Sequence, residues 1–214
     1  FKSSNTIEPY EISLDGKVIK IGVQICEDLW DQNYDLSVSD ELIRKGAEMM
    51  INISASPYRK SVIDKRLELC KDRAKDLKYY FIYCNMVGAQ DELVFDGRSF
   101  ILNADGKNKL LAKMFKQEIL DFNFNQSSNN EDLQVSSNFL EEVFKALRIG
   151  VRDYFSKTNF QKAVIGLSGG IDSALTAALV SEAIGPENVY GISMPSQFSS
   201  EHSKDDARLL ADNL

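Results

Sequence analysis

A short loop within residues 162–173 carries the groups that are best suited to binding a phosphate. The apolar run from Ala163 to Leu167 predicts a buried strand, which breaks at Ser168-Gly169-Gly170. A helical pattern follows at once and ends at Gly185-Pro186. Glycines let the backbone approach a ligand closely, and a helix N-terminus offers free N–H groups and partial positive charge. The loop therefore predicts an anion site, with glycines that serve packing alone as the alternative.

Three polar side chains could complete this anion site. Ser168 and Ser173 provide hydroxyl donors, and Asp172 places a carboxylate beside them. An acid next to an anion is favourable when it holds a divalent cation that bridges phosphates. The loop is not a Walker A loop, because no Gly-Lys-Ser/Thr follows the glycines.

Cys26 is a second candidate for chemistry, because it follows a predicted strand and precedes two acids, Glu27 and Asp28. A cysteine at an exposed turn can act as a nucleophile if a base or a cation activates its thiol. His202 is the only histidine, and it lies far along the chain in a predicted loop, so a Cys–His pair is a poor explanation. The alternative is a small buried hydrophobic residue, the usual fate of a free cysteine.

The elements that must position Cys26 can be predicted from periodicity. Alternation over residues 10–25, with Asp15-Gly16 as the turn, indicates a hairpin. Apolar residues fill the strand predicted over 79–87 almost continuously, so we expect it to be buried on both faces, with Cys84 in the core. The other predicted elements are helices over 38–47 and 60–77 and strands over 48–53, 93–95, 99–102 and 117–124.

The second half of the chain begins after a segment rich in Asn and Ser. Residues 125–138 predict a linker between a domain over 1–124 and a domain over 139–214. A second buried strand over 189–195 should lie parallel to the first, which puts a ligand at their carboxyl ends. A last helix is predicted over 204–214, with the serines before it as possible caps. The helix predicted over 139–156 has one apolar face, formed by Leu140, Val143, Phe144, Leu147, Val151 and Phe155.

Composition limits the possible functions. Hydrophobic residues make up 43% and charged residues 27%, as in ordinary soluble proteins, and a net charge of −7 argues against general nucleic-acid binding. Three cysteines without CxxC spacing predict neither a zinc site nor a disulfide framework and favour a cytoplasmic setting. No stretch approaches the roughly 20 apolar residues of a membrane span. The polar start lacks an initiator methionine, so we expect an internal piece of a longer protein without a signal peptide.

The loop resembles the SGGxDS loop of the ATP pyrophosphatase (PP-loop) family, which has a parallel-sheet, adenine nucleotide alpha hydrolase-like fold. The resemblance implies that Asp172 holds Mg²⁺. The segment from Met194, with its following serines, resembles NAD synthetases and implies contact with the adenine or the ribose. The implied ATP-binding residues are Gly166, Leu167, Ser168, Gly169, Gly170, Ile171, Asp172, Ser173 and Met194.

The first half resembles the later part of a nitrilase-type amidase domain, an αββα sandwich, in the version fused to glutamine-dependent NAD synthetases. ICEDLW at 25–30, NISASPY at 52–58 and YCNMVGAQDELVFDG at 83–97 carry this resemblance. It implies that Cys26 is the nucleophile, whose glutamate and lysine partners belong to segments that precede residue 1.

The same resemblance implies that Glu27 and Ser56 contact glutamine. A helix-start acid and a turn residue are the respective alternatives. The family usually has a lysine or arginine where Val62 stands, and Arg59 or Lys60 could replace it.

Together the resemblances imply a carbon–nitrogen ligase that amidates deamido-NAD to NAD with ammonia from glutamine. ATP would form an adenylated intermediate, which releases AMP and pyrophosphate, and Mg²⁺ would assist. A homo-oligomer is implied as well. The alternatives are another PP-loop amidotransferase, such as GMP synthetase, or an inactive folding piece.

Overall fold

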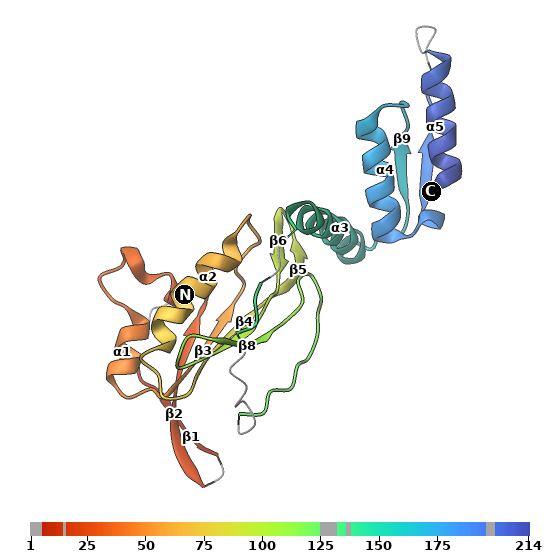
Figure 1. Ribbon diagram of the computed structural model, residues 1–214. Helices are drawn as coiled ribbons and strands as arrows, with labels where there is room; N and C mark the ends of the chain where they lie inside the picture. The colour runs from red at the N-terminus through yellow and green to blue at the C-terminus, as the bar shows by residue number, and fades with distance from the viewer. Residues whose placement is uncertain (1–5, 15, 125–131, 136–137, 196–199) are drawn as a thin grey trace. The chain divides into compact units, whose positions relative to one another are not determined.

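The computed structural model describes residues 6–14, 16–124, 132–135, 138–195 and 200–214 (Figure 1). Contacts divide the chain into two compact units, of which the first holds residues 1–87 and 95–137 and the second 88–94 and 138–214. The linker predicted over 125–138 lies largely outside the described residues, so the predicted domain boundaries stay a prediction.

A six-stranded sheet forms the frame of the first unit, in the order β1-β2-β3-β4-β7-β8 (Figure 1). Parallel pairing joins β2 to β3 and β3 to β4, whereas the other neighbours are antiparallel. The predicted hairpin of β1 and β2 is confirmed. The strands are β1 (Tyr10–Leu14), β2 (Lys17–Ile25), β3 (Met49–Ser54), β4 (Tyr80–Asn85), β7 (Phe100–Asn103) and β8 (Asn108–Leu111).

Residues 117–124 form no strand, so the edge strand predicted there is wrong. The sheet has β1 at one edge and β8 at the other, and β8 has no counterpart among the predicted strands. The alternation in 117–124 has a different cause. Phe122 and Phe124 pack their rings against Tyr80, with centroids 5.4 and 5.0 Å away. Aromatic packing on a neighbouring strand can thus produce a period of two without strand pairing.

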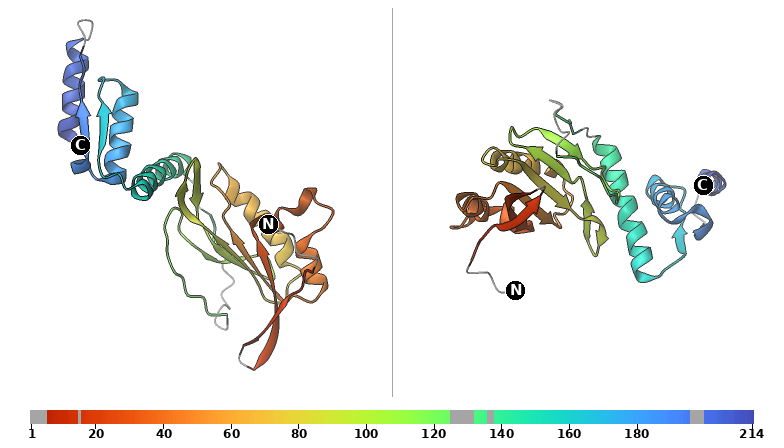
Figure 2. Two further views of the ribbon diagram at one scale, coloured as in Figure 1. Left: turned by 180° about the vertical axis from the view of Figure 1, so that it is seen from behind. Right: turned by 90° about the horizontal axis from the view of Figure 1, so that it is seen from below.

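Two helices, α1 (Val38–Arg44) and α2 (Val62–Ala74), cover one face of this sheet (Figures 1 and 2). The core lies between helices and sheet. It contains Leu29, Leu42, Ala47, Met50, Ile63, Cys70, Ala74, Leu77, Phe81, Tyr83, Phe100 and Leu102.

The strand β4 is fully buried only on the helix side, and its other face is half-buried or exposed, so the expected burial of both faces is wrong. Phe81, Tyr83 and Asn85 point toward the helices and are buried, whereas Cys84 is exposed. Strand side chains alternate between faces. An apolar run alone therefore does not show which face of a strand is covered. Cys84 is not a core residue, contrary to the prediction.

Gly22 lets α1 pack closely on the sheet. A Cβ on Gly22 would lie 2.3 Å from Met50 Sδ and 3.3 Å from Leu42 Cβ. We expect Gly22→Ala to lower the free energy of unfolding by about 1–3 kcal/mol, measured with urea, because the core must shift to admit the methyl group. Adding Met50→Ala should make room, so the double variant should lose less than the sum of the single losses. Additive losses would contradict the close packing.

The described residues of the second unit that follow residue 137 form two parallel strands and three α-helices. The strands β9 (Ala163–Gly166) and β10 (Val189–Ile192) pair in parallel, as predicted. The expected burial of both strands is wrong, because their residues are half-exposed or exposed. Leu167, directly after β9, is buried instead. The helices are α3 (Phe139–Thr158), α4 (Ile171–Ile184) and α5 (Glu201–Asn213).

The helix α3 buries a different face from the predicted one. Leu140 and Leu147 are 77% and 51% exposed, whereas Glu142, Ala146 and Ile149 are buried. The reason lies in a contact distant in sequence. Residues 88–94, the tip of the hairpin β5 (Val87–Gln90) and β6 (Leu93–Asp96), belong to this unit, and the Ala89 N–H donates to the Asp153 carboxylate at 2.8 Å.

The helix α5 begins earlier than predicted. Ser200 caps it by accepting the Ser203 N–H at 3.2 Å. His202 therefore lies in the first turn of a helix, where it is exposed, and not in a loop. Among the described residues, no helix is both long and apolar enough to cross a membrane.

Candidate functional site

Cys26 stands at a strained turn directly after β2. It opens the short 3-10 helix η1 (Cys26–Leu29) with a φ of 47°, a conformation that costs free energy for a residue other than glycine. The Ile25 N–H donates to the Asp28 carboxylate at 2.8 Å, and Leu29 is fully buried. The turn is thus fixed from both sides, and Cys26 remains half-exposed.

The cysteines differ in surroundings. Cys70 on α2 is fully buried, and burial raises the pKa of its thiol well above the usual value. A thiol that stays protonated is a poor nucleophile. Cys26 is the cysteine that lines a pocket together with Glu27 and Ser56.

This pocket has a volume of about 410 Å³ and brings together the three residues predicted for glutamine chemistry. Val62 also lines the pocket, at the position where the resemblance leads us to expect a lysine or arginine. Positively charged side chains come instead from the loop before α2 and from the first turn of α2. The complete lining is Cys26, Glu27, Trp30, Gln32, Asn33, Ser56, Pro57, Arg59, Lys60, Val62 and Lys65.

Glu27 has a partner that the sequence did not indicate. The Tyr34 hydroxyl donates to Glu27 Oε1 at 3.2 Å. This hydrogen bond, with the charge of Glu27, raises the pKa of Tyr34. The hydrogen bond from Tyr34 thus orients the Glu27 side chain at the pocket.

Ser56 is buried, and its hydroxyl faces away from solvent toward Arg66. The Arg66 side chain donates from Nε to Ser56 Oγ at 3.2 Å, and Asn85 Oδ1 accepts the Ser56 N–H at 2.9 Å. Arg66 was missed from the sequence. A signal existed, since Arg66 falls between Ile63 and Cys70 on the apolar face of the predicted helix.

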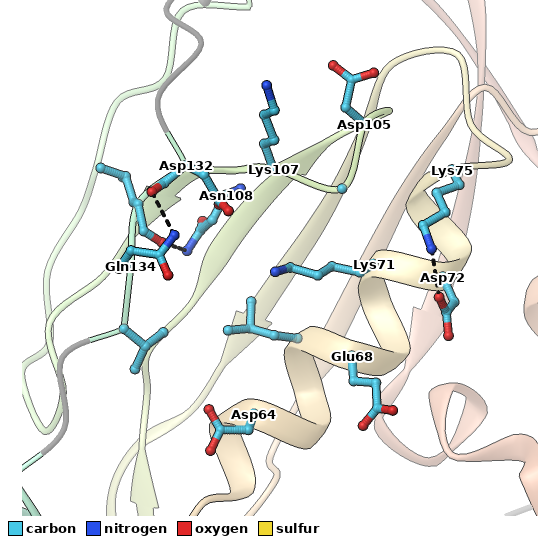
Figure 3. Close-up of a pocket in the computed structure, with 14 residues that line it drawn as sticks. Asp64, Glu68, Lys71, Asp72, Lys75, Asp105, Lys107, Asn108, Asp132 and Gln134 are labelled. Carbon is cyan, nitrogen blue, oxygen red and sulfur yellow. Dashed lines mark hydrogen bonds and ion pairs between the residues drawn. The ribbon is translucent and has the colours of Figure 1, made fainter.

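A second pocket of the first unit, about 550 Å³, lies between α2 and residues 132–135 (Figure 3). Lys71 extends from α2 into it, and Lys75 pairs with Asp72 at 3.1 Å (Figure 3). Its lining contains both acids and lysines but neither cysteine nor histidine. Among the described residues, no three His, Cys, Asp or Glu side chains gather as a metal would need. We assign this pocket no chemistry.

In the second unit, the predicted loop connects β9 to α4. Gly170 is the N-cap of α4, so the N–H groups of the first turn have no partner within the helix. The Ser173 hydroxyl accepts the Ser168 N–H at 3.2 Å and donates to the Gly170 carbonyl at 3.0 Å. These bonds hold the loop against the start of α4, and a helix N-terminus can bind an anion.

The remaining predicted loop residues divide by environment. Leu167 packs its side chain in the core of this unit with Ala177 and Ala207, so only its backbone can face a ligand. Ile171 is 80% exposed. The Met194 methyl group lies 3.3 Å from the position of a Cβ on Gly166, which brings the two predicted residues together.

Gly169 fixes α5 against the loop. Its φ is 79°, and a Cβ there would lie 2.2 Å from the Ser203 carbonyl oxygen. Glycine is required on both grounds, since the conformation disfavours a side chain and the backbone of α5 fills the space.

The donor set fits a polyphosphate with Mg²⁺. Hydroxyls and helix N–H groups suit phosphate oxygens, and Asp172 in the first turn of α4 offers the oxygen ligand that Mg²⁺ prefers. One carboxylate is enough, because Mg²⁺ usually takes one or two from the protein and completes its shell with phosphates and water.

Two family matches divide the chain as its motifs do. Residues 1–127 match the carbon-nitrogen hydrolase family, and residues 143–214 match the NAD synthase family. Because the first match covers more than half of the 214 residues, the chain belongs to the carbon-nitrogen hydrolase family.

Within this class, the chain is similar to glutamine-dependent NAD(+) synthetases. The enzyme of that name from Synechocystis sp. is 42% identical over 209 residues, which cover 92% of this chain and 38% of the relative. The one from Aquifex aeolicus is 36% identical, covering 97% and 42% respectively. The chain thus spans about two fifths of the length of these relatives.

A solved structure agrees. The glutamine-dependent NAD+ synthetase from Acinetobacter baumannii, in complex with ADP, has a TM-score of 0.81 at 31% identity, covering 97% of this chain and 39% of that one. The predicted resemblance and fold class are confirmed: part of a nitrilase-type domain, followed by the start of an α/β NAD synthase domain.

Proposed function

We propose that the chain is part of an enzyme that uses ATP to amidate deamido-NAD to NAD, with ammonia from glutamine. One observation carries the proposal: a strained cysteine turn in a pocket and a glycine loop at a helix start occur in the same chain. The first suits acyl transfer from an amide, and the second suits a nucleotide polyphosphate. Glutamine-dependent synthesis needs both.

At the first pocket, Cys26 Sγ attacks the side-chain amide carbon of glutamine. The tetrahedral intermediate collapses to a thioester and releases ammonia, and water then frees glutamate. The Glu27 N–H is suited to stabilise the oxyanion. The pocket has charges of both signs, which match a zwitterionic amino acid. The negative charge comes from Glu27, and the positive charges come from Arg59, Lys60 and Lys65. By resemblance, a glutamate base and a lysine complete this site from segments before residue 1.

At the second site, the loop residues 166–173 and Met194 hold ATP. The hydroxyls of Ser168 and Ser173 and the N–H groups of the first α4 turn orient the phosphates. Asp172 would hold Mg²⁺, which would neutralise their charge. Positioning and charge neutralisation dominate such phosphorus chemistry. The nicotinate carboxylate of deamido-NAD attacks the α-phosphorus, pyrophosphate leaves, and ammonia then displaces AMP.

The proposal includes a cellular compartment and an oligomeric state. We assign the enzyme to the cytoplasm, because its free cysteines suit a reducing compartment. A homo-oligomer is proposed from the family resemblance.

The test is an assay of the intact protein with ATP, Mg²⁺, deamido-NAD and glutamine. NAD, AMP and glutamate should form in equal amounts, because each turnover consumes one adenylate and one ammonia. Omission of deamido-NAD should stop AMP release, which separates this enzyme from other PP-loop amidotransferases. Absence of AMP from the complete mixture would overturn the proposal.

A further inference from the structure

We infer that the buried ion pair of Arg66 and Asp96 positions the Ser56-Pro57 turn, so that both are positioning residues of the glutamine pocket. The inference rests on the function proposed for that pocket. Neither Arg66 nor Asp96 lines the pocket, whereas Ser56 and Pro57 do. The pair therefore acts through the turn and not by touching substrate.

Burial makes this pair a costly way to stabilise a fold. The side chains of Arg66 and Asp96 are 0% and 1% exposed, and Arg66 Nη1 lies 2.9 and 3.1 Å from the two carboxylate oxygens. Removing two charges from water costs several kcal/mol each, which their attraction often only offsets. The other contacts of Arg66 therefore indicate what the pair does.

Those contacts go to one turn. Arg66 Nη2 donates to the Ser56 carbonyl at 2.7 Å, to Ser56 Oγ at 3.1 Å and to the Pro57 carbonyl at 3.3 Å. Its Nε donates to the same Oγ at 3.2 Å. A guanidinium is a rigid planar fork, so the carboxylate on one side fixes the direction in which the other side holds the turn.

Asn85 holds the same turn from β4. Its Nδ2 donates to the Ser56 carbonyl at 3.2 Å and to the Gly97 carbonyl at 3.1 Å, while its Oδ1 accepts the Ser56 N–H. The amide, carbonyl and hydroxyl of Ser56 are all fixed. Since the turn and Cys26 line one pocket, a displaced turn would misplace glutamine relative to the thiol, and misplacement by about 1 Å can cost roughly 10²-fold in rate.

The first test is Arg66→Lys in the intact protein. Lysine keeps the charge but is a point donor that cannot bind Asp96 and the turn together. We expect the KM for glutamine to rise about tenfold or more, while NAD formation from saturating ammonia stays within about twofold of wild type. Equal loss with both nitrogen sources would overturn the inference.

Two further variants separate positioning from stability. Arg66→Met/Asp96→Leu removes both buried charges, so it should resist urea about as well as wild type but keep the raised glutamine KM. Cys70→Ala is the matched control, because it leaves a cavity on the buried face of the same helix without touching the turn. It should lose stability with an unchanged KM. A wild-type KM in the double variant, or a KM raised as much by Cys70→Ala, would contradict the inference.

The rate of hydrogen exchange at the Ser56 amide measures how firmly the turn is held, and the measurement needs no substrate. Exchange should be faster in Arg66→Lys and in the double variant than in wild type, but not in Cys70→Ala. If wild type releases no glutamate from glutamine, the proposed function of the pocket fails, whereas the exchange rate still decides whether the pair holds the turn. Unchanged exchange overturns the inference whatever the activity.

Discussion

Cys26→Ala should abolish glutamine-dependent NAD formation, by roughly 10⁴-fold or more, and leave ammonia-dependent formation near the wild-type rate. Losing a nucleophile removes the covalent route, and losses of this order are seen when one member of a catalytic group is deleted. The loop that would hold ATP is in the other unit, so ammonia supplied from solution should still react there. NAD is measured with glutamine and with an ammonium salt, each at saturation.

Cys84→Ala is the control for this experiment. Cys84 is also a cysteine near the end of a strand of the same sheet, but it is exposed and does not line the pocket of Cys26. We expect it to keep both activities. If Cys26→Ala lost both activities equally, the strained turn would be structural, and the nucleophile assignment would fail.

The sequence predicted what depends on neighbours along the chain. The strand, glycines and helix around Ser168 and Asp172 are contiguous, and so are the strand and turn that present Cys26. Contacts across long sequence separations were not predictable in this way. Asp96 reaches Arg66 over 30 residues, and no local pattern indicates that pairing.

The incorrect predictions concern which face of an element is covered, and this also depends on contacts between residues distant in sequence. The apolar stripe through Leu140 and Leu147 predicted the wrong buried face of α3, because the hairpin tip near Ala89 and the helix α4 select that face. The prediction that Cys84 lies in the core is wrong, because an apolar strand does not reveal which of its faces is covered. Periodicity thus identified the elements better than it identified their partners.

Gly169→Ala should disable synthesis with either nitrogen source, by about 10²-fold or more, and weaken ATP binding. The alanine would need a φ of 79°, which is unfavourable for a side chain, and its Cβ would lie 2.2 Å from the Ser203 carbonyl oxygen. That oxygen is backbone in the first turn of α5, so it cannot move aside as a flexible side chain would. The loop and α5 must separate, which displaces the groups that orient ATP. NAD, AMP and the Kd for ATP are measured.

Two other glycines show whether the loss comes from this geometry. Gly170→Ala should lose less than Gly169→Ala, because Gly170 has an ordinary φ of −93° and a Cβ there would approach only Ser168 Oγ, at 3.3 Å. Gly150→Ala, within α3, should retain full synthesis, since its Cβ meets Val94 at an ordinary 3.7 Å and alanine favours a helix. Wild-type ATP affinity in Gly169→Ala would show that ATP binds elsewhere. Equal losses in all three variants would mean that the second unit tolerates no added methyl group, which would leave the loop without a special role.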